Sequence, residues 1–370
     1  MKNSHEVIQT DLDYITSSLG EEFGRLSGKE ILITGGAGFL GYYLVQAPLC
    51  WNQGKSAHRH IHVTVYDNFI RGVPSWLAQY RHDANLRLIR HDITQPLPPG
   101  NGHFQYMMHA ASIASPTYYR RYPINTMDAN VSGLRNLLEY FCALKSSRKP
   151  AEGFLFFSSS EVYGDPTPGN IPTPETYHGN VSFTGPRACY DEAKRFSETL
   201  CVNFAQQYDL PLTIARPFNN YGPGLKITDG RVLPDFARDA LAGRDIVMLS
   251  DGSPSRTFCY VADAIVGYYK ILVKGRGGEP YNIGVEEPEI SIADLAERVA
   301  AIARDLFGSK VDIVRRPSAD RDYLVDNPTR RCPMISKART ELGYHPSISL
   351  DEGLRRLLIW YSGNLHAEEA

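Results

Sequence analysis

Residues 30–41 read EILITGGAGFLG, and this stretch decides the fold class of the chain. Its first five residues are mostly apolar and β-branched, as in a short buried strand. A glycine-rich turn follows, and a helical pattern begins near Leu40. Glycines at this spacing allow a tight turn and a close approach of the backbone to a pyrophosphate, which then lies on the helix N-terminus. The stretch therefore predicts a dinucleotide-binding strand–turn–helix unit. The residues expected in this cofactor loop are Gly35, Gly38, Phe39, Leu40 and Gly41.

Strands and helices alternate through the first two-thirds of the chain. Five further stretches have the composition of buried strands: 61–67, 86–92, 105–111, 154–159 and 212–217. Helical stretches lie between them, notably 124–146 and 189–208. This alternation is typical of a parallel sheet with helices on both faces. We therefore expect an α/β fold with a doubly wound, Rossmann-type parallel sheet.

The pattern changes after Pro217, where glycine- and proline-rich loops alternate with short helices and isolated strands. We expect a smaller C-terminal α/β lobe that covers the C-terminal edge of the sheet, where ligands bind in such folds. Before the first strand, apolar residues recur at helical spacing and predict an amphipathic helix. The expected division is a helical extension over 1–28, a cofactor domain over 29–217 and a substrate lobe over 218–370, with an interleaved boundary.

The composition excludes several classes of function. The 370 residues carry a net charge of −2 without a basic or acidic block, so we expect neither nucleic-acid nor membrane binding. The chain has no signal-peptide pattern, and no apolar stretch approaches the ~20 residues of a membrane span. Six widely spread cysteines without a CxxC pair favour a reduced, cytoplasmic setting. His58, His60 and His62 alternate, but no carboxylate or cysteine joins them, so we expect no metal.

The second expected strand ends in Asp67 and Asn68. A carboxylate at this strand end accepts hydrogen bonds from an adenosine ribose and would repel a 2′-phosphate. Asp67 lies 32 residues beyond Gly35 rather than the usual ~20, and a polar surface insertion over 51–60 accounts for the excess. The pattern favours NAD over NADP, although the nearby Arg71 leaves NADP open. At the end of the third strand, Asp92 and Ile93 either border the adenine or are only a strand end.

Tyr190 and Lys194 stand four residues apart at the start of a predicted helix, so both project on one face. A tyrosine is a poor base at neutral pH because its free pKa is about 10. A lysine ammonium one turn away, together with the charge of a nicotinamide, would favour the phenolate. Lowering the pKa by ~3 units requires ~4 kcal/mol of differential interaction. The pair predicts a general acid–base site, whereas the same spacing alone often marks only an exposed helix face.

A strand that ends in hydroxyl groups precedes this pair. Residues 154–164 read FLFFSSSEVYG, so Ser158, Ser159 or Ser160 could bond a substrate hydroxyl and Glu161 adds a carboxylate. The alternative is a serine-rich strand exit with a solvated glutamate. We favour a shared site, because the tyrosine and lysine follow on the next predicted helix.

These motifs together resemble a known family. GGAGFLG, HAAS (109–112), SSSEVYG, YDEAK and RPFNNYGPG are similar to the extended short-chain dehydrogenases that act on nucleotide sugars, over roughly residues 29–360. Four stretches are closer still to the UDP-glucuronate decarboxylases, also called UDP-xylose synthases. These are SEVYGDP (160–166), GPRACYDEAKR (185–195), DGRVLPDF (229–236) and RTFCYVAD (256–263), with a looser match at ASPTYYRRYP (114–123).

The resemblance implies roles for particular residues. Ser159 takes the place of the family's catalytic threonine, and Ser160 stands between it and the matched glutamate. The residues that match catalytic positions directly are Glu161, Tyr190 and Lys194. Those that match nucleotide and diphosphate positions are Asn219, Arg231 and Arg256. Arg331 aligns with the arginine near the substrate carboxylate, which Tyr118 or Tyr119 is also expected to face. Ala110 and Ala111 of the HAAS motif are expected along the cofactor, as are Tyr190 and Lys194.

The chain departs from the family pattern at a few positions. The family commonly has arginine where this chain has Gly224, and residues 315–326 (RRPSADRDYLVD) are closer to sugar 4,6-dehydratases. Dehydratases, however, carry an Asp–Glu pair where this chain has Ser160 and Glu161, so the acid that protonates a leaving hydroxyl is missing. Simple 4-epimerases usually lack a glutamate at position 161.

The resemblance therefore implies an NAD-dependent lyase of carbohydrate biosynthesis that converts UDP-glucuronate to UDP-xylose through a 4-keto intermediate. A nucleotide-sugar 4-epimerase or 4,6-dehydratase is the alternative, and a non-catalytic NAD-binding protein on the same fold is a more distant one. It also implies a homodimer formed through the helices over 124–146 and 189–208.

Overall fold

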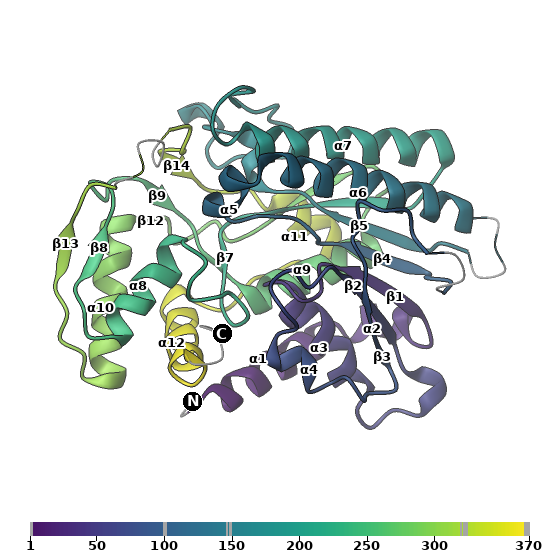
Figure 1. Cartoon of the computed structure of the whole chain (residues 1–370), viewed down its shortest axis with the longest axis horizontal. Coiled ribbons are helices and arrows are strands. Elements are labelled where there is room, and N and C mark those ends of the chain that lie inside the picture. Colours follow the sequence, from purple (N-terminus) through teal and green to yellow (C-terminus); the bar gives the residue numbers. More distant parts are fainter. Residues whose placement is uncertain are drawn as a thin grey trace.

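A parallel sheet organises the computed structural model, which describes residues 3–98, 102–145, 147, 150–318, 320 and 325–365. Within these residues the main sheet has seven strands in the order β11-β6-β5-β4-β1-β2-β3, all parallel (Figure 1). The strands are β1 Glu30–Thr34, β2 His62–Asp67, β3 Leu86–Arg90, β4 Tyr106–His109, β5 Gly153–Phe157, β6 Leu212–Pro217 and β11 Pro280–Ile283. The expected doubly wound parallel sheet is confirmed.

Helices cover both faces of this sheet, which explains why its strands are almost wholly apolar. Leu32 of β1 packs with α6 and α7, whereas Ile31 and Ile33 point to the opposite face, toward α3 and α9. The large helices are α3 Gly41–Asn52, α6 Pro123–Leu144, α7 Ala188–Tyr208 and α9 Val261–Lys274. The strand order reverses between β1 and β4, so the loops after these two strands diverge and leave the crevice in which such folds bind ligands.

The N-terminal extension forms two helices, α1 Ser4–Ser18 and α2 Gly20–Leu26, where the sequence predicted one. Its apolar face is buried, as an amphipathic helix requires. Asp11 is fully buried and accepts hydrogen bonds from the Tyr43 and Tyr260 hydroxyls, each at 2.6 Å, and from Arg356 at 2.6 Å. These hydrogen bonds connect α1 to helix α3, which follows the glycine-rich turn, and to the C-terminal part of the chain.

The chain beyond Pro217 builds a smaller lobe beside the C-terminal edge of the sheet (Figure 1). It also returns to the main sheet through α9 and β11. Its other elements are β7 Asn220–Tyr221, α8 Val232–Leu241, β8 Ile246–Met248, β9 Ser255–Arg256, β10 Cys259–Tyr260, β12 Ile290–Ser291, α10 Ile292–Phe307, β13 Ile313–Arg315, β14 Arg330–Arg331, α11 Ser336–Leu342 and α12 Leu350–Ser362. The short elements elsewhere are η1 Ala57–Arg59, α4 Ser75–Ala78, α5 Pro116–Arg121, η2 Ser160–Tyr163 and η3 Pro168–Asn170. The domain limits set from the sequence stay a prediction.

Candidate active site

The glycine loop lies at the crevice between β1 and β4. Gly35 has φ +71°, and a Cβ there would lie 2.6 Å from the Cα of Ala111. Gly41 packs so closely on the carbonyl of Gly36 that a side chain would not fit. The loop therefore rests directly on the Ala110–Ala111 backbone after β4, and only glycine allows this approach.

The outer side of this loop fits a dinucleotide. A Cβ on Gly38 would meet only the Gly35 carbonyl, at 3.1 Å, so the loop is open on that side. The next helix, α3, begins at Gly41 without a side-chain cap. The Tyr42 N–H donates to the Phe39 carbonyl at 3.2 Å, and other amide groups of the first turn can donate to a phosphate. Phe39 and Leu40 form the last turn before that helix.

Asp67 is held in place at the end of β2. Its carboxylate accepts the N–H of Ala37 at 3.1 Å and that of Phe69 at 2.9 Å. Burial raises the pKa of this carboxyl, and the two backbone hydrogen bonds oppose the change. Arg71 lies with its guanidinium carbon 5.8 Å from the Tyr118 ring centre. The carboxylate is thus hydrogen-bonded to the glycine loop, next to which a ribose-binding residue has to lie.

The other residues expected along the cofactor are placed less tightly. Asn68 is exposed and accepts the Ile70 N–H at 3.0 Å. Asp92 is exposed and accepts the Thr94 N–H at 3.0 Å, whereas Ile93 is buried. The Thr94 hydroxyl donates to the same Asp92 oxygen at 2.8 Å, so both contacts belong to the turn that follows the strand.

Tyr190 and Lys194 are both buried at the start of α7. The Tyr190 hydroxyl is hydrogen-bonded to Ser159, and Lys194 Nζ donates to the carbonyl of Phe157 at 2.6 Å. The Tyr119 ring stacks on that of Tyr190, with centroids 5.1 Å apart and planes inclined by 11°. Helix α7, the end of β5 and helix α5 thus converge on one phenol. Ser160 begins the 3₁₀ turn η2 and is buried.

The electrostatics of this pair differ from the sequence expectation. Burial raises the pKa of Tyr190 to about 12, and the Ser159 hydrogen bond and the charge of Arg231 only partly oppose it. Burial also lowers the pKa of Lys194 to about 7. The Lys194 nitrogen lies 5.7 Å from the Tyr190 ring centre and donates elsewhere. Within the chain itself, desolvation outweighs the lysine charge, so formation of the phenolate depends on further positive charge.

Glu161 is neutralised by two guanidinium groups. Arg331 binds it through both terminal nitrogens, Nη1 to Oε1 and Nη2 to Oε2, the latter at 2.8 Å. Arg187 Nη2 donates to the same Oε2 at 2.5 Å. Burial alone would raise the pKa of Glu161, but Arg187 and Arg331 together hold it far below its ordinary value. Glu161 is therefore an ionised, doubly paired carboxylate and not the solvated glutamate of the alternative interpretation.

Two residues of this cluster were not singled out from the sequence. Arg187 and Asp191 both lie in the GPRACYDEAKR stretch, so the motif itself was the available signal. Asp191 is buried beside Arg187, 3.8 Å from Nε. Burial and the charge of Glu161 raise the pKa of Asp191 to about 8.

The residues matched to nucleotide positions lie around the same mouth. Arg256 and Arg331 are register partners in neighbouring strands β9 and β14. Arg256 donates to the carbonyls of Pro328 and Ser255, and burial, with the charge of Arg331, lowers its pKa to about 10. Arg231 pairs with Asp229. The Asn219 amide donates to the Thr257 carbonyl at 2.8 Å.

Gly224, where the family commonly has arginine, has a structural explanation. It has φ +89° and packs against the Cβ of Tyr42. Tyr42 belongs to α3 and contacts Trp76 and Trp360, with ring centroids 5.0 and 5.7 Å away. A side chain at position 224 would collide with Tyr42, so this position accepts only glycine.

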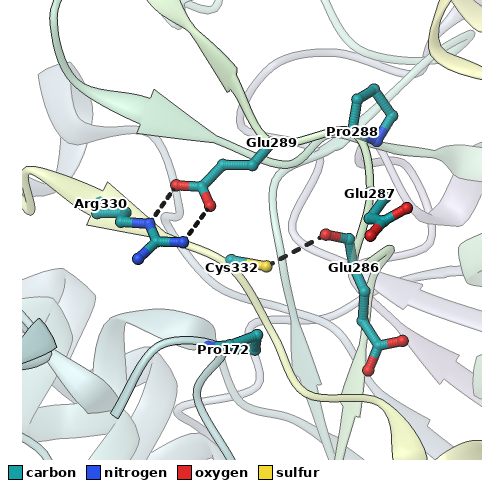
Figure 2. Close-up of a pocket in the computed structure, with 7 residues that line it drawn as sticks. All are labelled: Pro172, Glu286, Glu287, Pro288, Glu289, Arg330 and Cys332. Carbon is teal, nitrogen blue, oxygen red and sulfur yellow. Dashed lines mark hydrogen bonds and ion pairs between the residues drawn. The ribbon is translucent and has the colours of Figure 1, made fainter. Parts of the chain in front are cut away.

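Arg330, next to Arg331, points to a different site. Figure 2 shows a pocket of about 640 Å³ lined by Pro172, Glu286, Glu287, Pro288, Glu289, Arg330 and Cys332. Arg330 binds Glu289 there through two bonds of 2.6 Å. Successive residues of a strand face opposite sides, so Arg331 enters the buried cluster while Arg330 remains 45% exposed.

Other sequence features lie outside this site. His60 bonds Asn85 and the Lys55 carbonyl, and the described residues contain no group of three metal-ligating side chains. In the described part of the chain, no helix is both long and apolar enough to span a bilayer. Of the dehydratase-like segment 315–326, residues 319 and 321–324 lie outside the described residues.

The sheet, the glycine loop at its switch point and the buried Tyr190–Lys194 pair define an extended short-chain dehydrogenase type of enzyme. Residues 31–284 match the NAD dependent epimerase/dehydratase family, and the chain belongs to that family. The chain is 37% identical over 324 residues to UDP-glucuronic acid decarboxylase 3 of Arabidopsis thaliana, an alignment that spans 88% of this chain and 86% of that protein.

Two solved structures have the same fold. One is the UDP-glucose 4-epimerase of Thermotoga maritima with UDP-glucose, with TM-score 0.75, 25% identity, and coverage of 91% of this chain and 99% of that one. The other is the dTDP-glucose 4,6-dehydratase DesIV of Streptomyces venezuelae with NAD bound, with TM-score 0.75, 26% identity, and coverage of 91% and 98%. The expected cofactor, NAD, is the cofactor of this family.

Tyr190→Phe is expected to fold and bind NAD but to lower turnover by at least ~10²-fold, the usual contribution of a general acid–base group. Tyr208→Phe, at the exposed end of the same helix, is the control. Steady-state kinetics and NAD titration test both variants. Near-normal turnover of Tyr190→Phe would remove the phenol from the chemistry.

Asp67→Ala is expected to narrow the preference for NAD over NADP, because the carboxylate opposes a 2′-phosphate. Titration of both dinucleotides with the unmutated protein, this variant and Asp13→Ala tests the assignment, since Asp13 is exposed on α1. An unmutated protein that prefers NADP would contradict it.

Proposed function

We propose that this chain is an NAD-dependent nucleotide-sugar decarboxylase that converts UDP-glucuronate to UDP-xylose through a 4-keto intermediate. The observation that carries the proposal is the buried arginine cluster beside the Tyr190 phenol. Arg331 is 4% exposed, and Arg187 and Arg256 are also buried. Arg187 and Arg331 pair with Glu161 in the free enzyme, and a sugar carboxylate is a further anion that such buried guanidinium groups can bind, whereas a neutral sugar offers none. The decarboxylase relative supports the same substrate.

Each residue of the site has a part in this chemistry. NAD bound at the glycine loop supplies a hydride acceptor and later a hydride donor. Tyr190, bonded to Ser159, takes the proton of the sugar 4-hydroxyl as carbon 4 is oxidised. The product is a β-keto acid, so the bond between carbon 5 and the carboxylate breaks and its electron pair moves toward the C4 oxygen.

Completion of the cycle uses the same groups. Carbon 5 takes a proton from solvent in place of the lost carbon dioxide, and Tyr190 returns its proton as carbon 4 is reduced again. Arg331 orients the carboxylate during the first half of the cycle, and the diphosphate is held by Arg231 and Arg256. Because carbon 4 is first oxidised and then reduced, the overall reaction is not a net oxidation.

The epimerase and the dehydratase share the first step with this mechanism. A dehydratase needs an acid beside the catalytic glutamate, and this chain has Ser160 there. An epimerase needs no cation for a sugar carboxylate, so in an epimerase Arg187 and Arg331 would serve only to pair with Glu161. The contact between Ser159 and Tyr190, with Lys194 beneath, argues against a non-catalytic NAD-binding protein.

A product screen tests the function directly. The purified protein is incubated with UDP-glucuronate, UDP-glucose and dTDP-glucose, and the products are weighed by mass spectrometry. Loss of carbon dioxide from UDP-glucuronate supports the decarboxylase. Loss of water from a glucose substrate indicates a dehydratase, and an isomer of unchanged mass indicates an epimerase.

Arg331→Ala is expected to remove a charge-assisted contact of about 2–5 kcal/mol. Activity on UDP-glucuronate should fall by a factor of roughly 30 to several thousand. Arg330→Ala should matter much less, because Arg330 binds Glu289 in the outer pocket. Kinetics that follow carbon dioxide release compare the two. Full activity of Arg331→Ala would contradict the carboxylate assignment.

We further propose a homodimer in a cytoplasmic setting. Helices α6 and α7 lie side by side over one face of the sheet (Figure 1). They expose Ile124, Met127 and Phe196 by 66%, 43% and 53%. Six free cysteines suit a reducing compartment. Sedimentation should show a dimer, and Phe196→Glu should weaken it; an unmutated monomer at micromolar concentration would contradict the proposal.

A further inference from the structure

Glu161 is shared by two arginines that come from different parts of the fold. Arg187 directly precedes α7, and Glu161 lies in η2, which follows β5, so both belong to the main sheet and its helices. Arg331 lies on the two-residue strand β14 of the C-terminal lobe, 170 residues away in sequence. The ion pair of Glu161 with Arg187 therefore lies within the main sheet and its helices, whereas the ion pair with Arg331 joins this part of the fold to the C-terminal lobe.

The two arginines also differ in what else holds them. Arg331 binds the carboxylate with two nitrogens and also donates to the Gly164 carbonyl at 3.3 Å. Arg187 gives one bond to Glu161 and lies between that carboxylate and Asp191, with its guanidinium carbon 5.9 Å from the Tyr119 ring centre. Arg187 is thus fixed from three sides by residues that surround the catalytic phenol.

The cluster also holds unused hydrogen-bonding atoms. Four buried polar atoms around Glu161 lack a partner in the described part of the chain: Tyr119 Oη, Arg187 Nε, Asp191 Oδ1 and Arg331 Nε. Buried groups of this kind are normally satisfied. Arg331 Nε can donate a hydrogen bond to a substrate carboxylate. When the carboxylate binds both Nε and one terminal nitrogen, the guanidinium group turns away from Glu161.

We propose that Arg187 is a positioning residue that keeps Glu161 ionised and in place when Arg331 turns to the carboxylate of the substrate. The inference rests on the proposed function, because it needs a substrate that carries a carboxylate. In the free enzyme both arginines hold Glu161. In the substrate complex Arg187 alone remains, so its removal leaves a buried carboxylate without a counter-ion.

The groups that face Glu161 come from four elements. Helix α7 supplies Tyr190 and Asp191 and is directly preceded by Arg187, helix α5 supplies Tyr119, strand β14 supplies Arg331, and strand β9 supplies Arg256. The other carboxyl group among them is Asp191, whose pKa is raised by burial and by the charge of Glu161. Loss of Arg187 therefore raises the pKa of Glu161, and the rise is largest when Arg331 is engaged elsewhere.

The test is the pH dependence of carbon dioxide release from UDP-glucuronate by Arg187→Gln, Arg187→Lys and the unmutated enzyme. The acid limb of the kcat profile reports the pKa of the essential group in the substrate complex. The acid limb of the kcat/KM profile reports the pKa of that group in the free enzyme. In Arg187→Gln we expect the kcat limb to move up by about 1–3 pH units and the kcat/KM limb to move less. Arg187→Lys should restore most of the kcat profile.

A matched control separates this effect from a general loss of charge. Arg298→Gln breaks an exposed arginine–carboxylate pair with Asp351 and should leave both limbs unchanged. Should Arg187→Gln not fold, the double variant with Glu161→Gln removes the uncompensated charge and should fold. A double variant that also fails to fold would contradict the proposal.

The remaining outcomes are distinct. If Arg187→Gln folds and the acid limb of its kcat profile is unchanged, the inference is overturned. If the variant only raises KM, Arg187 binds the substrate itself, and this result also overturns the inference. Failure of the unmutated enzyme to release carbon dioxide would instead contradict the proposed function before any variant is compared.

Discussion

A carboxylate buried at the mouth of the sheet has to be neutralised, and the arrangement of the whole site follows from how this chain does so. Moving an ion into the protein interior costs several kcal/mol, and leaving one partner of a buried pair alone costs about 3–5 kcal/mol. Glu161 therefore requires both Arg187 and Arg331 in the free enzyme. Because Arg331 lies on β14, this requirement fixes the C-terminal lobe against the carboxyl ends of the strands. Strand β9 then brings Arg256 beside Arg331 in register.

A second buried network holds the 3₁₀ turn that carries Glu161. Ser158 donates to Glu198 at 2.5 Å, and Arg216 binds Glu198 at 2.8 and 2.5 Å. Arg216 also donates to the Tyr163 hydroxyl at 2.7 Å, which in turn donates to Asn282 at 2.8 Å. The bonds cross from β5 and α7 to β6 and β11. Since such networks are rigid only when their members are satisfied, they fix the neighbouring Ser159 and Glu161 from behind.

Local patterns in the sequence predicted the framework of this molecule but not the contacts across it. The strand at 212–217 and the helix near 189–208 match β6 and α7 because their periodicity is a local property. The N-terminal helix was predicted as one and is two, since Gly20 follows a break at Leu19. The pairing of Glu161 with Arg331 spans 170 residues, and no pattern in the sequence encodes it. Arg187 lies within the GPRACYDEAKR motif, but its contact with Glu161, 26 residues away, cannot be inferred from that motif alone.

The direction of the Tyr190 pKa shift could not be predicted from spacing either, because desolvation depends on burial and not on sequence distance. The same desolvation explains the charge balance of the site. Arg256 has its pKa lowered to about 10 by burial and by the neighbouring Arg331, so the cations oppose one another in the free enzyme. Anions placed among these arginines reduce the electrostatic repulsion between them, and the low dielectric constant of the protein interior strengthens each attraction. Glu161 supplies one negative charge among them and helps to raise the pKa of the neighbouring Asp191. A ligand that brings further negative charges, such as a nucleotide sugar acid with its diphosphate and carboxylate, would therefore reduce the repulsion among these cations.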